Sequence, residues 1–423
     1  MKKVYLPFIR PGDVNLRDKL VLIRVGIDSP VEPKTGKIID NPRIQRQAAF
    51  LKWLAGRGAK VVAVGHQGRP GRPDFTTTEQ HAVLLSKHMK RPVKYIPSDF
   101  GRDVEIATHY MKRGDVILLE NVRMHPDEMK ELDPETHHDG TLVKGLEHIF
   151  SYYINNDFST SHRPYASMVG FTGIPNIIGR DLENELRGAL AAKALDKHPY
   201  VYVMGGVKIP DLMPMIESSM EEGRIDRILC GGMLGSICLL AKGYRLGREE
   251  EVMKLTIKGG PEQFVSRMID LIRKYPDRIV SPVDVVVDAA GRPKVIPAGQ
   301  LPSKYPIADI GPETVKIFSK IIHEAKVVYL KGAMGQYEEQ DFEKGSMAIM
   351  KAAAHSGAYT LVGGGSVSDL AEKPEVRGKF SHVSLAGGAL VEVLCNKRLP
   401  ALRALEASAQ KWKGWKGKTN KTA

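Results

Sequence analysis

Short apolar runs alternate with helix-like stretches along most of the chain. Each run ends at a glycine or a polar residue, is too short for a buried helix and is rich in β-branched residues, which is typical of buried parallel strands. The runs cover residues 19–25, 60–69, 115–123, 152–157, 200–206, 227–232, 284–289, 326–332 and 359–365. Helical patterns, such as those at 43–58 and 312–325, lie between them. This alternation predicts an α/β fold with doubly wound parallel sheets.

The pattern changes near the middle of the chain. Residues 173–179 are typical of a loop, and residues 181–197 predict one long helix with leucine at 182, 186 and 190. A helix of this kind can join two lobes, so two Rossmann-like lobes joined by a helix hinge are favoured over one sheet of nine or ten strands. We expect the lobes to span residues 1–178 and 179–399.

The strand ends of the first half carry basic side chains. Ligands of doubly wound sheets bind beyond the carboxyl ends of the strands, so these positions decide the chemistry. Arginine and histidine follow successive strands, and one arginine begins a helix. They are Arg24, Arg43, His66, Arg69, Arg123, His125, His162 and Arg163. Each arginine alone could pair with a surface acid, but their shared placement favours one site for a phosphate or carboxylate.

The strand ends of the second half carry glycines instead. Pairs or triplets occur at 205–206, 231–232, 363–365 and 387–388, and Gly332 and Gly335 follow another strand. Glycine lets backbone N–H groups approach an anion closely, although one such turn can serve helix packing alone. No GxxxxGK[ST] or GxGxxG pattern occurs. The set favours a nucleotide-binding lobe in which Lys208 is the cation for the phosphates.

Composition narrows the function classes. The chain has 423 residues, 42% hydrophobic and 26% charged, as in a globular protein without a membrane span or signal peptide. The net charge of +13 falls to +8 without the five lysines of residues 411–423, which we expect to form a solvated, disordered end. No basic run remains, so we expect no nucleic-acid partner. Three cysteines without CxxC spacing predict neither a disulfide nor a zinc site and favour the cytoplasm.

The motifs together resemble those of the phosphoglycerate kinase family over nearly the whole chain. The matching stretches, in order, are "VLIRV", "DNPRIQ", "GHQGRPGRPD", "VILLENVRMHPDE", "HRPYASMVGF", "MGGVKIPD", "GGMLGSICLLAKGY", "SPVDVVV", "DIGPET", "KGAMGQYE", "VGGGS" and "FSHVSLAGGALVEVL". The resemblance implies a bilobal, hinge-closing enzyme that moves a phosphoryl group between ATP and the carboxylate of 3-phosphoglycerate. It also implies that residues 400–423 pack back on the first lobe.

The triose side of the family pattern is largely retained. The residues matched to its basic patch are Arg43, His66, Arg69, Arg123 and Arg163. The family's aspartate and asparagine after "RV" are Gly26 and Asp28 here. One acid is therefore lost and another gained, and we count Asp28 among the substrate-binding residues.

The nucleotide side departs further from the pattern. Lys208 matches the first lysine of "GGxKxxDK", but the second is Leu212, and the asparagine of "NGPMG" is Lys331, which could replace the lost charge if it points into the cleft. "GGGDT", whose aspartate helps to hold the metal, ends in Ser366 and Val367, so the metal ligand is unknown. Asp369 is one alternative. The residues matched to nucleotide binding are Gly205, Gly206, Lys208, Gly232, Lys331, Glu338, Gly363, Gly364, Gly365 and Ser366, and those matched to catalysis are Arg43, Lys208 and Gly388.

Three functions remain open on the sequence alone. The leading one is phosphoglycerate kinase activity with ATP or ADP and Mg²⁺, in which Arg43 and Lys208 neutralise the moving phosphoryl group. The second is a paralogue that acts on another phosphorylated carboxylate. The third is a weakly catalytic metabolite-binding protein. For each, a monomer or homodimer with no membrane partner is expected.

Overall fold

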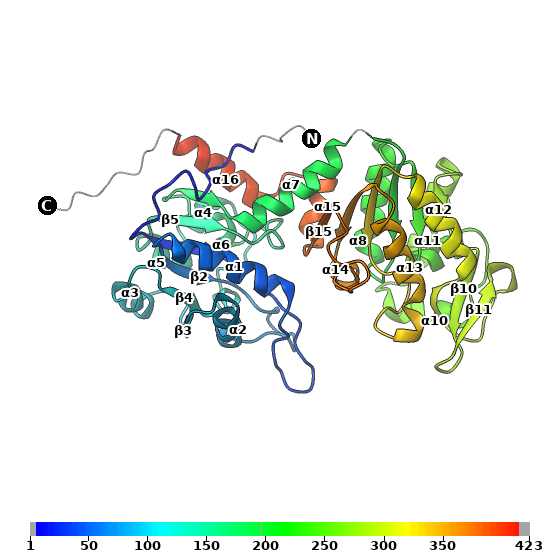
Figure 1. Cartoon of the computed structure of the whole chain (residues 1–423), viewed down its shortest axis with the longest axis horizontal. Coiled ribbons are helices and arrows are strands. Elements are labelled where there is room, and N and C mark those ends of the chain that lie inside the picture. The colour runs from blue at the N-terminus through cyan, green and yellow to red at the C-terminus, as the bar shows by residue number, and fades with distance from the viewer. Residues whose placement is uncertain (1–5, 196, 414–423) are drawn as a thin grey trace. The chain divides into compact units, whose positions relative to one another are not determined.

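The chain forms two compact units (Figure 1). The computed structural model describes residues 6–195 and 197–413, so residues 414–423 of the expected disordered end lie outside the described residues. Unit 1 comprises Met1–Arg187 and Asn396–Ala423, and unit 2 comprises Gly188–Cys395. The boundary thus falls within the long helix α7 (Arg180–Ala194) rather than before it at 178–179.

Unit 1 is built on a six-stranded parallel sheet with strand order β3-β4-β2-β1-β5-β6. The strands are β1 (Leu20–Arg24), β2 (Lys60–Val64), β3 (Lys94–Ile96), β4 (Val116–Leu119), β5 (Tyr152–Asn155) and β6 (Asn176–Ile178). Arg24 pairs with Asn155 in the register of β1 and β5. The central strands are buried, as expected of a sheet that is covered on both faces.

Helices cover both faces of this sheet. They are α1 (Pro42–Gly56), α2 (Glu79–Met89), α3 (Arg102–His109), η1 (Val122–Met124), α4 (Pro134–His138), α5 (Thr141–Glu147) and α6 (Ala166–Val169). Val21 packs with the apolar faces of α1 and α2, whereas its neighbour Leu22 packs with those of α3 and α5. This alternation follows from the period of two along a strand.

The C-terminal helix α16 (Pro400–Lys411) belongs to unit 1. It packs against β6 and α6. The Ser408 hydroxyl accepts a hydrogen bond from the Asn176 backbone N–H at 2.7 Å, and the Ala401 N–H donates to the Ser161 carbonyl. These bonds tie the end of the described chain to the sheet of the first unit.

Unit 2 contains a second six-stranded parallel sheet, with order β15-β14-β13-β7-β8-β9. Its strands are β7 (Tyr200–Met204), β8 (Arg227–Cys230), β9 (Ile279–Val280), β13 (Val327–Lys331), β14 (Tyr359–Gly363) and β15 (His382–Ser384). The helices are α8 (Ile209–Glu221), α9 (Gly232–Ala241), α10 (Arg248–Thr256), α11 (Glu262–Lys274), α12 (Pro312–Glu324), η3 (Gln340–Phe342), α13 (Lys344–Ala354), α14 (Gly365–Ala371) and α15 (Gly388–Leu394). The expected two parallel sheets are therefore present.

One strand expected in a parallel sheet lies elsewhere. Residues 284–289 form β10 (Asp284–Asp288), which pairs antiparallel with β11 (Pro293–Pro297) and β12 (Ile307–Ile310) in a separate three-stranded sheet. The 3-10 helix η2 (Ala298–Gln300) follows β11. A buried run of β-branched residues does not distinguish a parallel strand from the centre of a small antiparallel sheet, so the sequence pattern was misread here.

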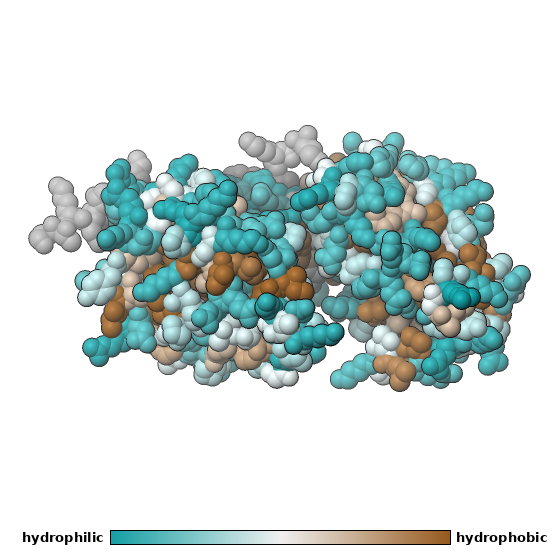
Figure 2. Space-filling view, turned by 60° about the horizontal axis from the view of Figure 1, so that its bottom comes forward, coloured by the Kyte–Doolittle hydropathy of each residue, from teal (hydrophilic) through white to brown (hydrophobic). Residues whose placement is uncertain are grey.

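Most of the face seen in Figure 2 is hydrophilic, and brown apolar residues are scattered over it in small groups. Among the described residues, no helix is both long and apolar enough to span a bilayer.

Candidate active site

Arg24 is the centre of a buried polar network at the carboxyl end of β1. Its side chain is fully buried. Nε donates to the Ser167 hydroxyl, Nη1 donates to the Val25 carbonyl, and Nη2 lies 2.7 Å from His66 Nδ1. Nη1 also lies 3.3 Å from Asp157 Oδ2, which gives the guanidinium an anionic partner. Arg24 is therefore a structural cation of the first lobe's strand ends.

His66 is held neutral by this network. Burial lowers its pKa well below the ordinary value, and the nearby charges of Arg24, Arg123 and Arg43 lower it further, whereas Asp157 raises it. The guanidinium can only donate, so Nδ1 accepts and the ring proton lies on Nε2. Nε2 faces Asp28 Oδ2 at 3.8 Å.

Arg43 is placed by the start of α1. Asn41 caps the helix by accepting hydrogen bonds from the N–H groups of Arg43 and Ile44, and Pro42 occupies the first turn. The sequence "DNPR" thus sets Arg43 at the helix start. Its guanidinium donates to the Ser159 hydroxyl at 3.1 Å, in the loop after β5. This hydrogen bond connects the start of α1 to the loop after β5.

Arg123 lies in η1 after β4 and reaches the loop after β2. Its Nη1 donates to the Gly68 carbonyl, and its guanidinium lies over the Tyr165 ring, 5.9 Å from the centroid. Burial and Arg24 lower its pKa. Its buried Nε has no acceptor among the described residues, and it forms no ion pair there within 4.0 Å. This donor is available to an anion.

The remaining predicted triose residues lie around this cluster. Asp28 accepts a hydrogen bond from the Gly68 N–H at 2.8 Å. Arg69 is exposed just beyond Gly68. Arg163 pairs with Glu131 at 3.0 Å, on the surface. Hydrogen bonds and charge thus bring together Arg24, Arg43, His66 and Arg123. Among the described residues, no hydrogen bond or ion pair joins Arg69 or Arg163 to these four.

In unit 2 backbone hydrogen bonds join the loops after β7, β8 and β13. The N–H groups of Gly205, Gly206 and Gly232 donate to the carbonyls of Lys331, Ala333 and Met334. A Cβ at Gly205 would lie 2.1 Å from the Ala333 oxygen, and one at Gly332 would lie 2.0 Å from the Gly205 oxygen. These glycines are therefore required for loop packing, whatever else they bind.

Other glycines of the second unit face open space. A Cβ at Gly365 would meet nothing within 4 Å, and one at Gly364 would meet only Lys331 Nζ at 3.9 Å. Gly364 has a φ of 108°, which L side chains rarely adopt. Gly363 is different, because a Cβ there would lie 2.3 Å from Leu390. Gly388 is the exposed first residue of α15.

Lys331 and Lys208 lie near each other at these loops. Burial lowers the pKa of Lys331, Asp211 raises it, and Lys208 lowers it. Lys331 forms no ion pair or side-chain hydrogen bond with a described residue, and its Nζ lies 3.9 Å from the place that a Cβ on Gly364 would take. Lys208 is exposed and caps the start of α8. The expectation from the sequence, that Lys331 points into the cleft and replaces the lost charge, stays a prediction.

Leu212, which stands where the family motif has its second lysine, is a buried residue of α8. It is 2% exposed and lies on the buried face of α8 with Ile209, Met213 and Ile216. The leucine is a core residue of this helix rather than a loop residue.

An acidic group lies near the end of β13. Tyr337 Oη donates to Asp369 Oδ2 at 3.3 Å. Burial raises the pKa of Asp369, as does the neighbouring carboxylate of Glu338, whereas Tyr337 lowers it. Ser366 lies one helical turn before Asp369 in α14, and Val367 between them is buried.

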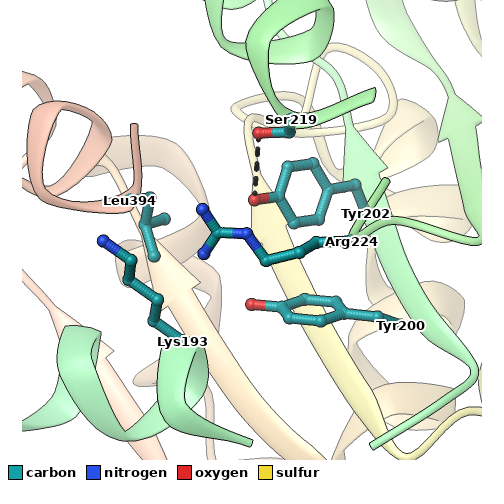
Figure 3. Close-up of a pocket in the computed structure, with 6 residues that line it drawn as sticks. All are labelled: Lys193, Tyr200, Tyr202, Ser219, Arg224 and Leu394. Atoms are coloured by element: carbon teal, nitrogen blue, oxygen red, sulfur yellow. Dashed lines mark hydrogen bonds between the residues drawn. The ribbon is translucent and has the colours of Figure 1, made fainter. Parts of the chain in front are cut away.

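A small pocket of unit 2 lies away from these loops, at the first residues of β7 (Figure 3). Its lining includes Lys193, Arg224 and Leu394, and the hydroxyls of Tyr200 and Tyr202 point toward the Arg224 guanidinium. Tyr202 and Ser219 are hydrogen-bonded at 3.4 Å. The free space is about 10 Å³, room for about one water molecule, so the pocket is no candidate for the nucleotide.

Comparison with known proteins settles the family. A sequence model described as "Phosphoglycerate kinase" matches residues 12–397. The chain is 37% identical to the phosphoglycerate kinase of Methanothermobacter thermautotrophicus over 96% of this chain and 98% of that protein. It is 35% identical to that of Pyrococcus abyssi, over 96% and 98%. The crystal structure of phosphoglycerate kinase from Pyrococcus horikoshii OT3 superposes with a TM-score of 0.90 at 34% identity, over 95% of this chain and all of that chain.

The chain belongs to the phosphoglycerate kinase family. The activity expected from the sequence, phosphoryl transfer with a carboxyl group as acceptor, is that of the family, as is the α/β fold of two parallel sheets. The predicted enzyme class is therefore confirmed. Small molecules are the substrates of such enzymes.

Two residues of the buried polar network in unit 1 were missed by the sequence reasoning. Arg24 was noted at a strand end but not chosen, because nothing in the sequence shows that it is fully buried. Asp157 was overlooked although it follows a strand. No sequence signal marks it, because its place depends on the pairing of β1 with β5.

Proposed function

We propose that this chain phosphorylates the carboxylate of 3-phosphoglycerate with ATP, and runs the reverse reaction with ADP, through the residues described above. In unit 1, Arg43, His66, Arg123 and the neighbouring Asp28, Arg69 and Arg163 would bind the triose. In unit 2, Lys208 and Lys331 would bind the phosphates, with the open glycines Gly364, Gly365 and Gly388 beside them. The packed glycines Gly205, Gly206, Gly232 and Gly363 would shape the loops. Ser366, the second residue of α14, would contact the nucleotide, and Glu338 would contact the ribose.

One observation carries this proposal. Each unit holds a mostly buried cation at a strand end that forms no ion pair with a described residue: Arg123 in unit 1 and Lys331 in unit 2. A buried charge without a counter-ion costs several kcal/mol of folding free energy. A bound phosphate or carboxylate would offset that cost. Arg123 is matched to the basic patch of the family's triose side, and Lys331 replaces the asparagine of its "NGPMG" motif on the nucleotide side.

The residues would act mainly by position and charge. Phosphoryl transfer needs little covalent chemistry from the protein, since the substrate carboxylate is the nucleophile. Arg43 would align and neutralise the acceptor end, and Lys208 and Lys331 would neutralise the phosphoryl oxygens. Because the triose ligands lie in one unit and the phosphate ligands in the other, both units are needed for turnover.

Mg²⁺ fits the oxygen donors of unit 2. It is commonly held by one or two carboxylates together with substrate phosphates. Asp369, one turn after Ser366, would be its protein ligand. The described residues contain no group of three or more potential metal ligands, which agrees with a metal held largely by the nucleotide. When bound, the ion would neutralise phosphate charge.

The setting of the enzyme is also part of the proposal. All three cysteines are free, and Cys230 and Cys238 are buried. This supports a reducing, cytoplasmic location. We propose a monomer or homodimer that binds no nucleic acid.

Turnover of the purified protein tests the proposal. The protein would be assayed with 3-phosphoglycerate and MgATP, and the acyl phosphate would be reduced in a coupled reaction. Arg43→Ala and Lys208→Ala are expected to lower kcat by about 10²-fold or more. Arg102→Ala and Lys254→Ala, which change exposed residues of the same two units, are the matched controls. Binding of 3-phosphoglycerate without turnover would contradict the proposal, and turnover only with other phosphorylated acids would replace its substrate.

A further inference from the structure

Gly26 and Asp157 lie opposite one another across two neighbouring strands. The register pairs Arg24 of β1 with Asn155 of β5. Both strands end at this pair, and two residues further along each chain segment position 26 lies beside position 157. A Cβ built on Gly26 would lie 2.8 Å from Asp157 Oδ1 and 3.2 Å from its Cγ. The carboxylate of Asp157 therefore fills the space that a side chain at position 26 would occupy.

The backbone does not require glycine at position 26. Its φ lies outside the left-handed region that favours glycine. Asp157 is 1% exposed and is held by its neighbours, so it cannot give way to a new side chain. The space taken by Asp157 is thus the reason that residue 26 has none. In the family pattern quoted above, position 26 itself carries the aspartate.

Asp157 is buried as a charged group. Burial alone would raise its pKa, but Arg24 and hydrogen bonds from Ser159 and Thr160 hold the pKa below the ordinary range. Ser159 Oγ donates to Oδ1 at 2.6 Å, and Arg24 Nη1 lies 3.3 Å from Oδ2. No hydrogen bond from a described residue reaches Oδ2.

This carboxylate is connected to the proposed triose ligands. Arg43 donates to the Ser159 hydroxyl at 3.1 Å, and that hydroxyl donates to Asp157. On its other side Asp157 pairs with Arg24, which in turn donates to His66 Nδ1 at 2.7 Å. Loss of Asp157 would free Ser159 and leave the buried Arg24 with Glu128 alone, at 3.9 Å.

We propose that Asp157 supplies, from the loop after β5, the carboxylate that the family carries at position 26. It acts as a positioning residue, which orients Arg43 through Ser159 and fixes Arg24 beside His66. Relative to the family pattern, the acid at position 26 is exchanged for glycine, and the carboxylate of Asp157 fills the space of its side chain. This inference rests on the proposed binding of 3-phosphoglycerate to unit 1.

The exchange is tested by a double-mutant cycle on the full chain, because coupled residues give non-additive effects. Asp157→Asn and Asp157→Ala are each expected to raise the KM for 3-phosphoglycerate about tenfold or more, with the KM for ATP unchanged. Gly26→Asp alone is expected to raise this KM more than either Asp157 variant does, since two carboxylates cannot share the space. Gly26→Asp/Asp157→Ala is expected to recover most of the loss, because it restores one carboxylate at the same place.

Controls and a binding readout keep the outcomes distinct. Gly12→Asp adds an acid where a Cβ would meet nothing within 4 Å, and Asp103→Ala removes an exposed acid of the same unit. Calorimetric titration with 3-phosphoglycerate follows the same variants without turnover, and circular dichroism melts verify folding. The inference is overturned if the double variant binds 3-phosphoglycerate no more tightly than Asp157→Ala does. It is also overturned if Asp157→Asn has the same KM for 3-phosphoglycerate as Asp103→Ala. If the unsubstituted protein binds 3-phosphoglycerate but does not turn it over, the proposed function is wrong. The calorimetric titrations then still show whether Asp157 supplies the carboxylate of position 26.

Discussion

Arg24 Nη2 lies 2.7 Å from His66 Nδ1, with both side chains buried at the carboxyl ends of neighbouring strands β1 and β2. A guanidinium has no lone pair to offer, so the imidazole must accept and cannot carry two protons. The relationship makes His66 a neutral imidazole with its proton on Nε2, rather than a cation.

His66 is therefore expected to stay neutral throughout the physiological range. Burial, followed by Arg24, holds its pKa well below the ordinary value. The unfolded chain would take up this proton below about pH 6.5, so the group lowers the stability of unit 1 as the pH falls through that value. Histidine ring signals in NMR spectra between pH 5.5 and 8 test this. A His66 titration midpoint near 6.5 would contradict it.

Lys331 is expected to contribute to nucleotide binding in place of the lysine lost at Leu212. Lys331→Met should lower kcat/KM for ATP by about 10²-fold, because one preorganised cation is removed, and should leave the KM for 3-phosphoglycerate unchanged. Lys326→Met changes an exposed lysine before the other end of β13 and is the control. Equal kinetics of the two variants would show that Lys331 does not meet the phosphates.

The glycines of unit 2 are expected to divide into two classes. Gly205→Ala places a Cβ 2.1 Å from the Ala333 oxygen, and such overpacking costs about 1–3 kcal/mol of unfolding free energy. Gly387→Ala has open space and a φ of −99°, so its stability should be unchanged. Denaturant unfolding of the two variants tests the division. The same denaturation midpoint in both variants would show that the loops accommodate a Cβ at Gly205 without loss of stability.

Two buried acids are expected to make unit 2 less stable as the pH rises toward neutrality. Burial raises the pKa of Glu249 and of Asp309 to about 7 each. Glu249 accepts from the Ile307 N–H, and Asp309 accepts from the Gly345 N–H, so both attach β12 to helices. The folded state binds more protons than the unfolded state between pH 5 and 7. Stability should fall there by up to about 1.4 kcal/mol per pH unit for each acid.

Unfolding of Glu249→Gln at pH 5, 6, 7 and 8 measures this effect. The amide cannot ionise, so its unfolding free energy should depend less on pH than that of the unsubstituted chain. Glu324→Gln, an exposed acid of the same unit, is the matched control. An unchanged slope for Glu249→Gln would contradict the assignment.

Much of the fold could be predicted from hydrophobic periodicity. The nine apolar runs became strands, because buried β-branched segments of this length have few alternatives. The three-residue strands β3, β6 and β15 were too short to give a signal, and β10 was placed in the wrong kind of sheet. Strand partners depend on contacts distant in sequence, which the periodicity does not contain.

The site was predictable where local sequence sets position. The cap at Asn41 fixes Arg43, and glycine pairs mark the loops of unit 2. The pairing of Gly26 with Asp157 could not be predicted, since it depends on the register of two strands far apart in the chain. Nor could the buried place of Leu212, since its helix has apolar residues on more than one side.

The central claim is that each unit supplies the ligands for one substrate. Titration calorimetry of the full-length protein with 3-phosphoglycerate and, separately, MgATP tests it most directly when Arg43→Ala and Lys208→Ala are compared with the unsubstituted chain. The account predicts that Arg43→Ala weakens only 3-phosphoglycerate and that Lys208→Ala weakens only MgATP, each by about tenfold or more. Weakening of MgATP by Arg43→Ala with no effect on 3-phosphoglycerate would contradict it.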